Sequence, residues 1–229
     1  QALQDLTMRS LGGRKYESVF LANQGTKQRR LVALKRAVAR VYASIFAPAG
    51  IEFRAERGLL DFSEEMGIMI QEVVGTRVGR RFLPAYAGIA LSRNDFRWSP
   101  KIRREDGVVR IVPGLGTRAV KRTTDDYPIL IAPGQPGLAV NRTVEEVLRY
   151  APRMIDVIDL DSGRLEEVEI AKLLGESGQD FPLLEQLVSV HQNGELLPVE
   201  QRELDLVRDE LVVTCDGLIS RSPFVGQIS

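Results

Sequence analysis

The chain is poor in the residues that build covalent cross-links and transition-metal sites. Its 229 residues include one cysteine, Cys215, and one histidine, His191. A lone cysteine cannot form a disulfide within the chain, and a zinc site needs several cysteine or histidine ligands. The sequence therefore excludes a disulfide scaffold and a cysteine–histidine zinc site, and it fits a reducing, cytoplasmic setting.

Net charge and long apolar runs are also missing. Lys plus Arg and Asp plus Glu both number 31, so no net field favours nucleic acid or an anionic membrane. No apolar run approaches the roughly 20 residues that cross a bilayer, and the first residues lack the basic and apolar regions of a secretion signal. We expect neither nucleic acid nor a membrane among the partners.

The remaining composition is that of a folded protein with one large core or two small ones, because 44% of the residues are hydrophobic and 27% are charged. Alternating helices and strands with one hairpin predict a mixed α/β or α+β domain. The sequence predicts strands at residues 67–74, 87–94, from 108 to the glycines that follow, 129–131 and 211–214, with a hairpin at 155–160 and 165–170. It predicts helices at 27–47, 143–150, 181–191 and 199–209.

The helix at 27–47 follows from an apolar stripe of residues three and four apart, and Pro48 is expected to end it. Its basic face favours a solvated surface over a phosphate site. Thr143 and Glu146 have the spacing of a capping box. Cys215 is expected to be a buried thiol in a strand rather than a nucleophile, and His191 to cap the end of the helix at 181–191.

The most informative stretch runs from Val108 to Tyr127, where an apolar strand meets a Gly-Leu-Gly turn and a dense set of hydroxyl, cationic and acidic side chains. Gly114 and Gly116 bracket Leu115, and paired glycines let the backbone approach a ligand closely. An isolated motif of this kind also occurs as a tight turn between strands. The surrounding segments must decide between the two interpretations.

Five other segments supply that context. Together with the Gly-Leu-Gly turn, they resemble the nucleotide-binding domain of the pyruvate phosphate dikinase and phosphoenolpyruvate synthase family, which has the ATP-grasp fold. The segments are Arg9-Ser10, residues 15–20 (KYESVF), residues 43–46 (ASIF), residues 67–74 (GIMIQEVV) and residues 87–94 (AGIALSRN). The resemblance implies a partial ATP-grasp domain over 1–229, incomplete at both ends, with a first part at 1–66 and a second at 67–229.

The resemblance also implies ATP and Mg²⁺ as cofactors and gives individual residues roles. Arg9 is expected to meet the triphosphate as a catalytic residue, since a guanidinium binds phosphate with two donors. Adenine is expected against Gln71, Glu72, Val73 and Val74. The other expected nucleotide-binding residues are Arg93, Gly114, Gly116, Thr117 and Arg118, with Asn94 beside Arg93.

The sequence departs from the family at Thr117. Related domains commonly read Gly-Leu-Gly-Glu, with the glutamate expected to bind metal, whereas this chain has a hydroxyl followed by Arg118. Threonine can ligate Mg²⁺ or donate to phosphate, but it brings no negative charge. Asp125 and Asp126 are candidates for the missing metal ligands, and a helix cap or turn is the other interpretation of these two residues.

If the family activity is retained, ATP transfers a phosphoryl group to a histidine on a separate domain of a longer chain, and pyruvate at another domain then accepts it. Two alternatives remain at this stage. Thr117 and Arg118 also fit a degenerate nucleotide-binding regulatory module, and relatives that share this domain use an antibiotic or a glucan as acceptor.

Overall fold

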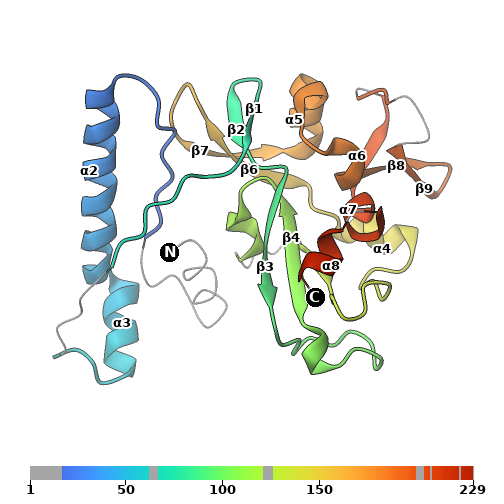
Figure 1. Ribbon diagram of the computed structural model, residues 1–229, viewed down its shortest axis with the longest axis horizontal. Helices are drawn as coiled ribbons and strands as arrows, with labels where there is room; N and C mark the ends of the chain where they lie inside the picture. The colour runs from blue at the N-terminus through green and yellow to red at the C-terminus, as the bar shows by residue number, and fades with distance from the viewer. Residues whose placement is uncertain are drawn as a thin grey trace. The chain divides into compact units, whose positions relative to one another are not determined.

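The computed structural model describes residues 17–61, 67–120, 126–199, 204–206, 208–221 and 223–228. The chain divides into two units, which Figure 1 traces from blue to red. The first contains the chain up to Val73 together with residues 158–165, and the second contains residues 74–157 and the chain from Glu166 onward. The boundary between Val73 and Val74 falls inside the segment that the family resemblance associates with adenine.

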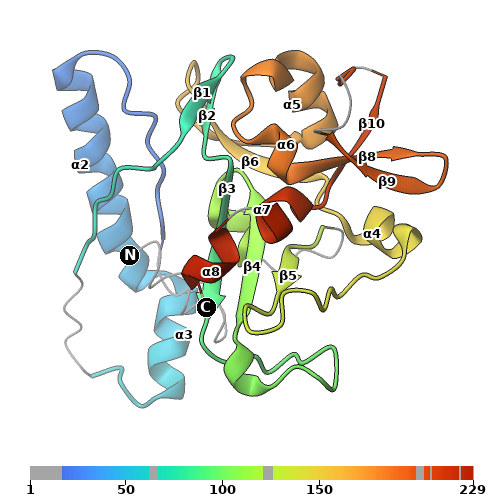
Figure 2. The ribbon, with the colours of Figure 1, turned by 45° about the vertical axis from the view of Figure 1, so that its right-hand side comes forward.

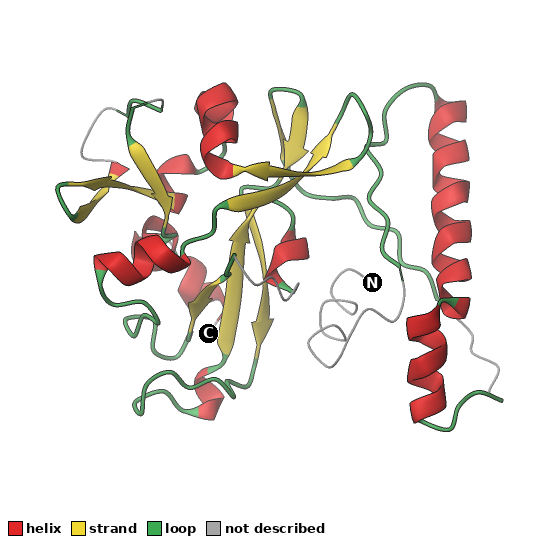
Figure 3. Cartoon of the chain, turned by 180° about the vertical axis from the view of Figure 1, so that it is seen from behind, coloured by secondary structure: helices red, strands yellow, loops and turns green. Residues whose placement is uncertain are grey.

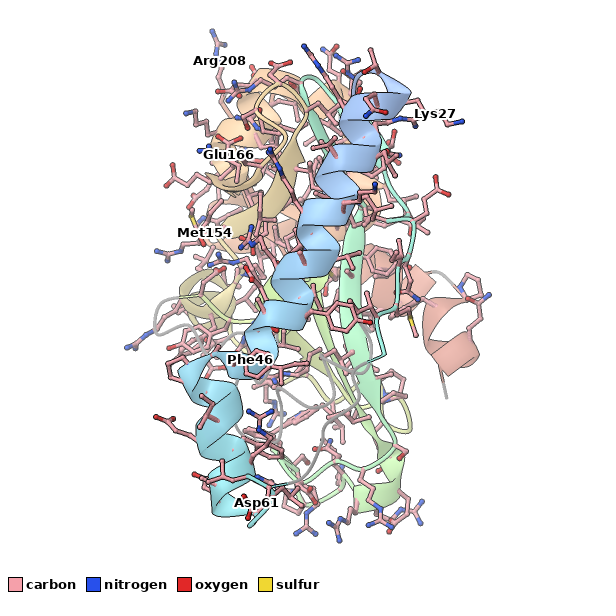
Figure 4. All side chains as sticks on the ribbon, turned by 90° about the vertical axis from the view of Figure 1, so that its left-hand side faces the viewer. Lys27, Phe46, Asp61, Met154, Glu166 and Arg208 are labelled. Carbon is pink, nitrogen blue, oxygen red and sulfur yellow. The ribbon has the colours of Figure 1, made fainter. Side chains whose placement is uncertain are left out.

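The first unit contains two consecutive helices. Helix α2 spans Lys27–Ala43, and Thr26 caps it by accepting a hydrogen bond from the Arg29 N–H at 3.3 Å. The short 3₁₀ helix η1 spans Ser44–Phe46, and α3 spans Pro48–Glu56. Figure 4 shows this order, with Lys27 at one end, Phe46 at the junction and Asp61 beyond α3.

The predicted helix at 27–47 is confirmed as α2 followed by η1, and Pro48 has a second role that was not expected. Pro48 occupies the first position of α3, where its missing N–H has no partner to lose and its fixed φ suits a helix. The proline therefore starts a second helix as well as ending the first.

Ten short strands form three sheets in the chain that the structure describes. The central sheet has the order β3-β4-β5, and its strands β3 (Tyr86–Leu91) and β4 (Val108–Pro113) lie side by side in Figure 3. Figure 2 shows β5 (Ile129–Ile131) beside β4. A four-stranded sheet has the order β1-β2-β6-β7, formed by Thr76–Val78, Arg81–Leu83, Met154–Asp159 and Leu165–Glu169.

Strand β4 is the middle of the central sheet and is buried along most of its length. It pairs antiparallel with β3, from Tyr86 opposite Pro113 to Leu91 opposite Val108, and antiparallel with β5 on its other side. Only Arg110 among its residues is not buried. A strand with neighbours on both sides and covered faces needs branched apolar residues throughout, which explains the sequence VVRIVP and confirms the predicted strand.

The core of the second unit joins these sheets to the C-terminal part of the chain. Ile111, Leu83 and Ile155 lie in one buried cluster with Leu173, Leu187, Val190, Val213 and Leu218. The mixed α/β class with antiparallel sheets is confirmed. Within the ranges given above, no helix combines the length and apolar character needed to cross a membrane.

The C-terminal elements differ from those predicted. After α5 (Ile170–Ser177) and η4 (Gly178–Asp180), the predicted helix at 181–191 is replaced by a four-residue helix, α6 (Leu184–Leu187), and by β8 (Val188–Gln192). Strands β9 (Glu195–Pro198) and β10 (Glu210–Val213) pair with β8 on its two sides. Helices α7 (Asp216–Arg221) and α8 (Phe224–Ile228) follow.

A two-residue turn explains the first of these errors. Asn193 and Gly194 both have positive φ, at 52° and 79°, and they connect Gln192 to its strand partner Glu195. An Asn-Gly pair is the strongest short hairpin signal, and the helical pattern hid it. His191 therefore lies in a strand rather than at a helix end, and its Nδ1 lies 2.7 Å from a carboxylate oxygen of Glu210.

Two other predicted elements are not formed as expected. Residues 67–75 lie outside any strand and are largely exposed, with Val74 at 85%; apolar composition predicts burial, but a strand also needs a neighbour with which to pair. Residues 204–206 and 208–209 are not helical. There the carboxylates of Asp205 and Asp209 accept hydrogen bonds from nearby backbone N–H groups, in competition with a helix.

The other local predictions are confirmed. Thr143 and Glu146 exchange the two hydrogen bonds of a capping box at the start of α4 (Val144–Tyr150). Strands β6 and β7 form the predicted hairpin, where the Gly163 N–H donates to the Asp159 carbonyl at 2.9 Å. In the loop after β3, the half-buried Trp98 donates from its Nε1 to the Leu138 carbonyl at 2.7 Å.

Cys215 is fully buried as predicted, although it follows β10 rather than lying within it. Burial, with a smaller contribution from Asp216, raises the pKa of the Cys215 thiol to about 12. Because the fold favours the neutral thiol, the associated stability is present below the ordinary thiol pKa and is lost as pH rises above it.

The thiol of Cys215 is expected to react only after the protein opens. At pH 8 its thiolate fraction is roughly a thousandfold below that of an exposed thiol, and no reagent can reach it in the folded state. Labelling with a chromogenic disulfide should therefore be slow in buffer and fast in denaturant. Equal rates in the two conditions would contradict the buried position.

Gly114 is expected to tolerate no side chain. Its φ is +70°, and an added Cβ would lie 2.4 Å from Ile155 Cγ1 and 2.7 Å from the Asp156 carbonyl oxygen. We expect Gly114→Ala to lower the free energy of unfolding in urea by about 2–4 kcal/mol, from positive φ and overpacking together. The control is Gly175→Ala in α5, where nothing lies within 4 Å of an added Cβ and stability should rise slightly; equal effects at both sites would contradict the constraint.

Candidate functional site

The Gly-Leu-Gly turn is packed against the sheets that surround it. The Gly114 N–H donates to the Ala85 carbonyl at 3.3 Å, and the Leu115 N–H donates to the Asp156 carbonyl at 3.0 Å. Gly114 and Asp156 also form a parallel bridge, so the end of β4 is joined to β6. Leu115 is buried, whereas Gly116 and Thr117 are half-buried at the start of η3 (Gly116–Ala119). These last two residues are the accessible part of the turn.

The hydroxyl of Thr117 has a charged partner inside the protein. Its Oγ1 donates to Asp156 Oδ2 at 2.5 Å, and the carbonyl oxygen of Leu115 lies farther away at 3.4 Å. Because the proton is held by a carboxylate, the outward part of the hydroxyl consists of oxygen lone pairs. A threonine at this position could ligate Mg²⁺ or donate a hydrogen bond to phosphate. Donation to phosphate is disfavoured, because the hydroxyl already donates to Asp156.

Arg118 points into the protein and lies among three carboxylates. Its Nε is 2.9 Å from Asp126, its Nη1 is 3.3 Å from Asp156, and Nη1 also pairs with Glu167. Burial acts to lower the pKa of the guanidinium, but the hydrogen bonds to these carboxylates and their charges outweigh it, so the pKa is raised. The side chain is only 5% exposed and remains charged.

Asp156 binds both Thr117 and Arg118, and no sequence motif points to this residue. It is 1% exposed, and its two carboxylate oxygens bind different residues, Oδ2 with Thr117 and Oδ1 with Arg118. A signal was available, because Asp156 interrupts the apolar strand MIDVID, and a buried carboxylate needs partners. The partners could not be identified, since they lie about 40 residues away.

Arg93 lies at the other end of the central sheet from the turn. The antiparallel register places Tyr86 opposite Pro113, beside the turn, and Leu91 opposite Val108. At about 3.4 Å per residue, the end of β3 at Leu91 is roughly 20 Å along the sheet from the level of Gly114, and Arg93 lies two residues beyond it. The structure brings Gly114, Gly116, Thr117, Arg118 and Asp126 together and leaves the exposed Arg93 apart from them.

Asn94, next to Arg93, has a structural position. It is fully buried, its N–H donates to the Arg104 carbonyl at 2.8 Å, and its Oδ1 accepts hydrogen bonds from the N–H groups of Phe96 and Arg97. A short polar side chain with these partners is typical of an Asx turn. The side-chain Oδ1 of Asn94 thus stabilises the loop that follows β3.

The remaining predicted residues belong elsewhere or lie outside the description. Gln71 and Glu72 are exposed and Val73 is half-buried, all in the first unit, whereas the exposed Val74 begins the second. Arg9 and Asp125 lie outside the described residues. The roles of all of them in binding nucleotide or metal stay predictions.

Two described carboxylates near the turn, Asp126 and Asp156, are already occupied by protein groups. Asp126 binds the Arg118 guanidinium and also accepts a hydrogen bond from the Arg153 N–H at 2.7 Å. Asp156 is occupied by Thr117 and Arg118. Over the part of the chain with described coordinates, no group of three His, Cys, Asp or Glu residues could hold a metal ion. The positive charge among these carboxylates is the guanidinium of Arg118.

Removing that charge is expected to destabilise the second unit. Arg118→Met leaves two buried carboxylates without their cation, which should lower the free energy of unfolding by about 3–5 kcal/mol at pH 7.5. The loss should appear as a lower midpoint of unfolding in urea, because the folded state then holds negative charges that no cation balances.

The control is Arg104→Met. Arg104 forms an exposed pair with Asp95 at 2.9 Å, and its loss should cost less than about 1 kcal/mol. Urea unfolding of both variants makes the comparison. Equal losses of stability in Arg118→Met and Arg104→Met would contradict the described network.

Comparison with known proteins identifies the family. A family model described as "Pyruvate phosphate dikinase, AMP/ATP-binding domain" matches residues 2–176. No curated protein and no solved structure matches the chain. The match covers most of the chain and includes the turn, Thr117, Arg118 and Asp156, and the mixed α/β architecture with antiparallel sheets agrees with an ATP-grasp-like domain. The chain belongs to the pyruvate phosphate dikinase AMP/ATP-binding domain family.

Proposed function

We propose that this chain is the ATP-binding part of a phosphotransferase related to phosphoenolpyruvate synthase and pyruvate phosphate dikinase. ATP would transfer its pyrophosphoryl group to a histidine on a separate domain of a longer chain and leave as AMP. The terminal phosphoryl group would pass to water or inorganic phosphate, and pyruvate would accept the remaining phosphoryl group from that histidine. The observation that carries the proposal is the family match over residues 2–176. A cytoplasmic location and Mg²⁺ as the counterion of the ATP phosphates belong to the same proposal.

In this proposal the turn contributes shape and one oxygen to the nucleotide site. Gly116 and Thr117 are half-buried and accessible, whereas Arg118 is turned into its carboxylate cluster. Three carboxylates surround that one guanidinium, so the cluster has no surplus positive charge to offer phosphate. We therefore assign Arg118 to holding the turn.

The phosphates then need cations from elsewhere in the chain. Arg9 is the residue proposed for this role, because its planar donors bind phosphate with two hydrogen bonds and keep their charge at neutral pH. Gln71, Glu72, Val73 and Val74 are proposed for adenine. Arg93 is retained as a phosphate contact only if the triphosphate reaches the far end of the central sheet.

A regulatory nucleotide-binding module is the second candidate, and a specific observation favours it. The family's usual glutamate is replaced by Thr117, and the neighbouring carboxylates are already bound to Arg118. Such a module would bind nucleotide with little dependence on Mg²⁺, whereas a competent kinase domain needs the metal on its phosphates. A phosphotransferase acting on an antibiotic or a glucan differs only in its acceptor domain.

Calorimetric titration of the intact protein with ATP tests the proposal. We expect saturable binding of ATP that tightens when Mg²⁺ is present. Arg9→Ala should weaken binding about tenfold, the magnitude of a charge-assisted hydrogen bond. The exposed Arg104→Ala is the control and should leave the affinity unchanged.

The outcomes separate the candidates. Failure of the unaltered protein to bind ATP would end both. Binding of equal strength with and without Mg²⁺ would favour the regulatory module. If the complete protein bound ATP with Mg²⁺ but released no AMP in the presence of pyruvate, the synthase assignment would have to be withdrawn.

A further inference from the structure

We propose that Asp156 is a positioning residue of the nucleotide site, acting through the Thr117 hydroxyl and the Arg118 guanidinium. The inference rests on the proposed function, because it concerns the same turn. Asp156 lies on β6, far from the turn in sequence, and the Gly-Leu-Gly motif does not predict its position. Its role would be to fix the orientation of the accessible polar group before nucleotide arrives.

The contacts of Asp156 span the whole turn. Its main-chain oxygen accepts from the Leu115 N–H at 3.0 Å, and its backbone forms the parallel bridge with Gly114. Its Oδ2 accepts from Thr117 Oγ1 at 2.5 Å, and its Oδ1 lies 3.3 Å from Arg118 Nη1. One residue of β6 thus contacts four of the five residues from Gly114 to Arg118.

The carboxylate contacts determine how Thr117 faces a ligand. An exposed threonine hydroxyl can rotate and can donate or accept. Here the hydroxyl donates its hydrogen bond to the carboxylate, so the hydroxyl oxygen presents lone pairs in a fixed direction. Such an oxygen can accept a hydrogen bond from a ribose hydroxyl or ligate Mg²⁺ carried by the phosphates. A group that is ordered before binding loses less entropy on binding, so the carboxylate would strengthen nucleotide binding without touching the nucleotide.

Arg118 keeps this carboxylate in place. Asp156 is 1% exposed, and a buried carboxylate needs a cation or hydrogen-bond donors to hold it. The guanidinium binds one oxygen and leaves the other to Thr117. Arg118 thus holds the Asp156 carboxylate, and the carboxylate in turn orients the Thr117 hydroxyl.

A second buried cluster shows that an arginine with carboxylate partners is not by itself a sign of this role. Arg81 has a 4% exposed side chain and pairs with Glu166 at 3.3 Å and Glu176 at 2.7 Å. Among the described residues, neither Glu166 nor Glu176 forms a hydrogen bond with Gly114, Leu115, Gly116, Thr117 or Arg118. That cluster holds β2 to neighbouring elements, and it supplies a control for loss of stability without loss of positioning.

The experiment compares ATP affinity among matched variants of the intact protein, by calorimetry below their unfolding temperatures. Asp156→Asn should weaken ATP binding about tenfold. Glu167→Gln, which removes a carboxylate from the same guanidinium at a half-exposed position, should change it less than about twofold. Glu176→Gln should likewise leave affinity unchanged while lowering the unfolding temperature.

Thr117 variants test the same claim at a half-buried, accessible position, with the unfolding temperature of each variant measured alongside its ATP affinity. Thr117→Ser keeps the hydroxyl and should bind ATP as the unaltered protein does. Thr117→Val keeps the shape, loses the hydroxyl and should weaken binding to the same degree as Asp156→Asn. In the double variant Thr117→Val/Asp156→Asn, the loss should be no larger than in either single variant, because the two residues act in series.

The outcomes are distinct. If the unaltered protein binds ATP but Thr117→Val binds equally well, Asp156 does not act through the hydroxyl and the inference is overturned. Additive losses in the double variant, or equal losses in Asp156→Asn and Glu167→Gln, would overturn it as well. Absence of ATP binding by the unaltered protein would instead end the proposed function on which the inference rests.

Discussion

The ion pair between Arg118 and Asp156 is the interaction on which the turn depends. A guanidinium with a 5% exposed side chain and a carboxylate with 1% exposure stabilise each other only because both are present. Each charge would be costly to bury alone, and the pair is satisfied further by Asp126, Glu167 and Thr117. Since Arg118 follows the Gly-Leu-Gly motif and Asp156 lies on β6, the pair joins two sheets at the point where the chain turns.

The surrounding packing makes this arrangement specific. Gly114 has no room for a side chain beside Ile155, and Leu115 is buried below the turn. Strand β4 leads into the turn with paired neighbours on both sides, so the turn cannot shift without disturbing the register of the central sheet. A short motif of two glycines thus gains a defined geometry from contacts outside the motif.

Sequence patterns predicted those elements whose cause is local. The capping box at Thr143 and Glu146 and the buried strand β4 both follow from neighbouring residues. Errors arose where a local pattern had two solutions or needed a distant partner. Residues 181–191 carried a helical pattern, yet Asn193 and Gly194 favour the hairpin, and residues 67–74 had strand composition but form no strand.

The candidate site was predictable only where its features depend on residues that are neighbours in sequence. The turn itself was identified, because glycines and polar residues after a strand are visible in the sequence. Asp156 was missed, since its partners are identified only by the fold. The expected convergence of Arg93 with the turn is not observed, because the antiparallel pairing of β3 with β4 sends the end of β3 away from the glycines.

The substitution at the family's glutamate position has a physical consequence for any ligand. A carboxylate there would lie beside Asp156 and be repelled by it, whereas a hydroxyl can donate to it. Arg118 then neutralises part of a cluster that would otherwise carry only negative charge. Thr117 and Arg118 thus form an inward-facing network with Asp156 and leave one oriented oxygen at the turn. Because Arg118 is already paired with carboxylates, the turn has no unpaired cation to offer a negatively charged ligand.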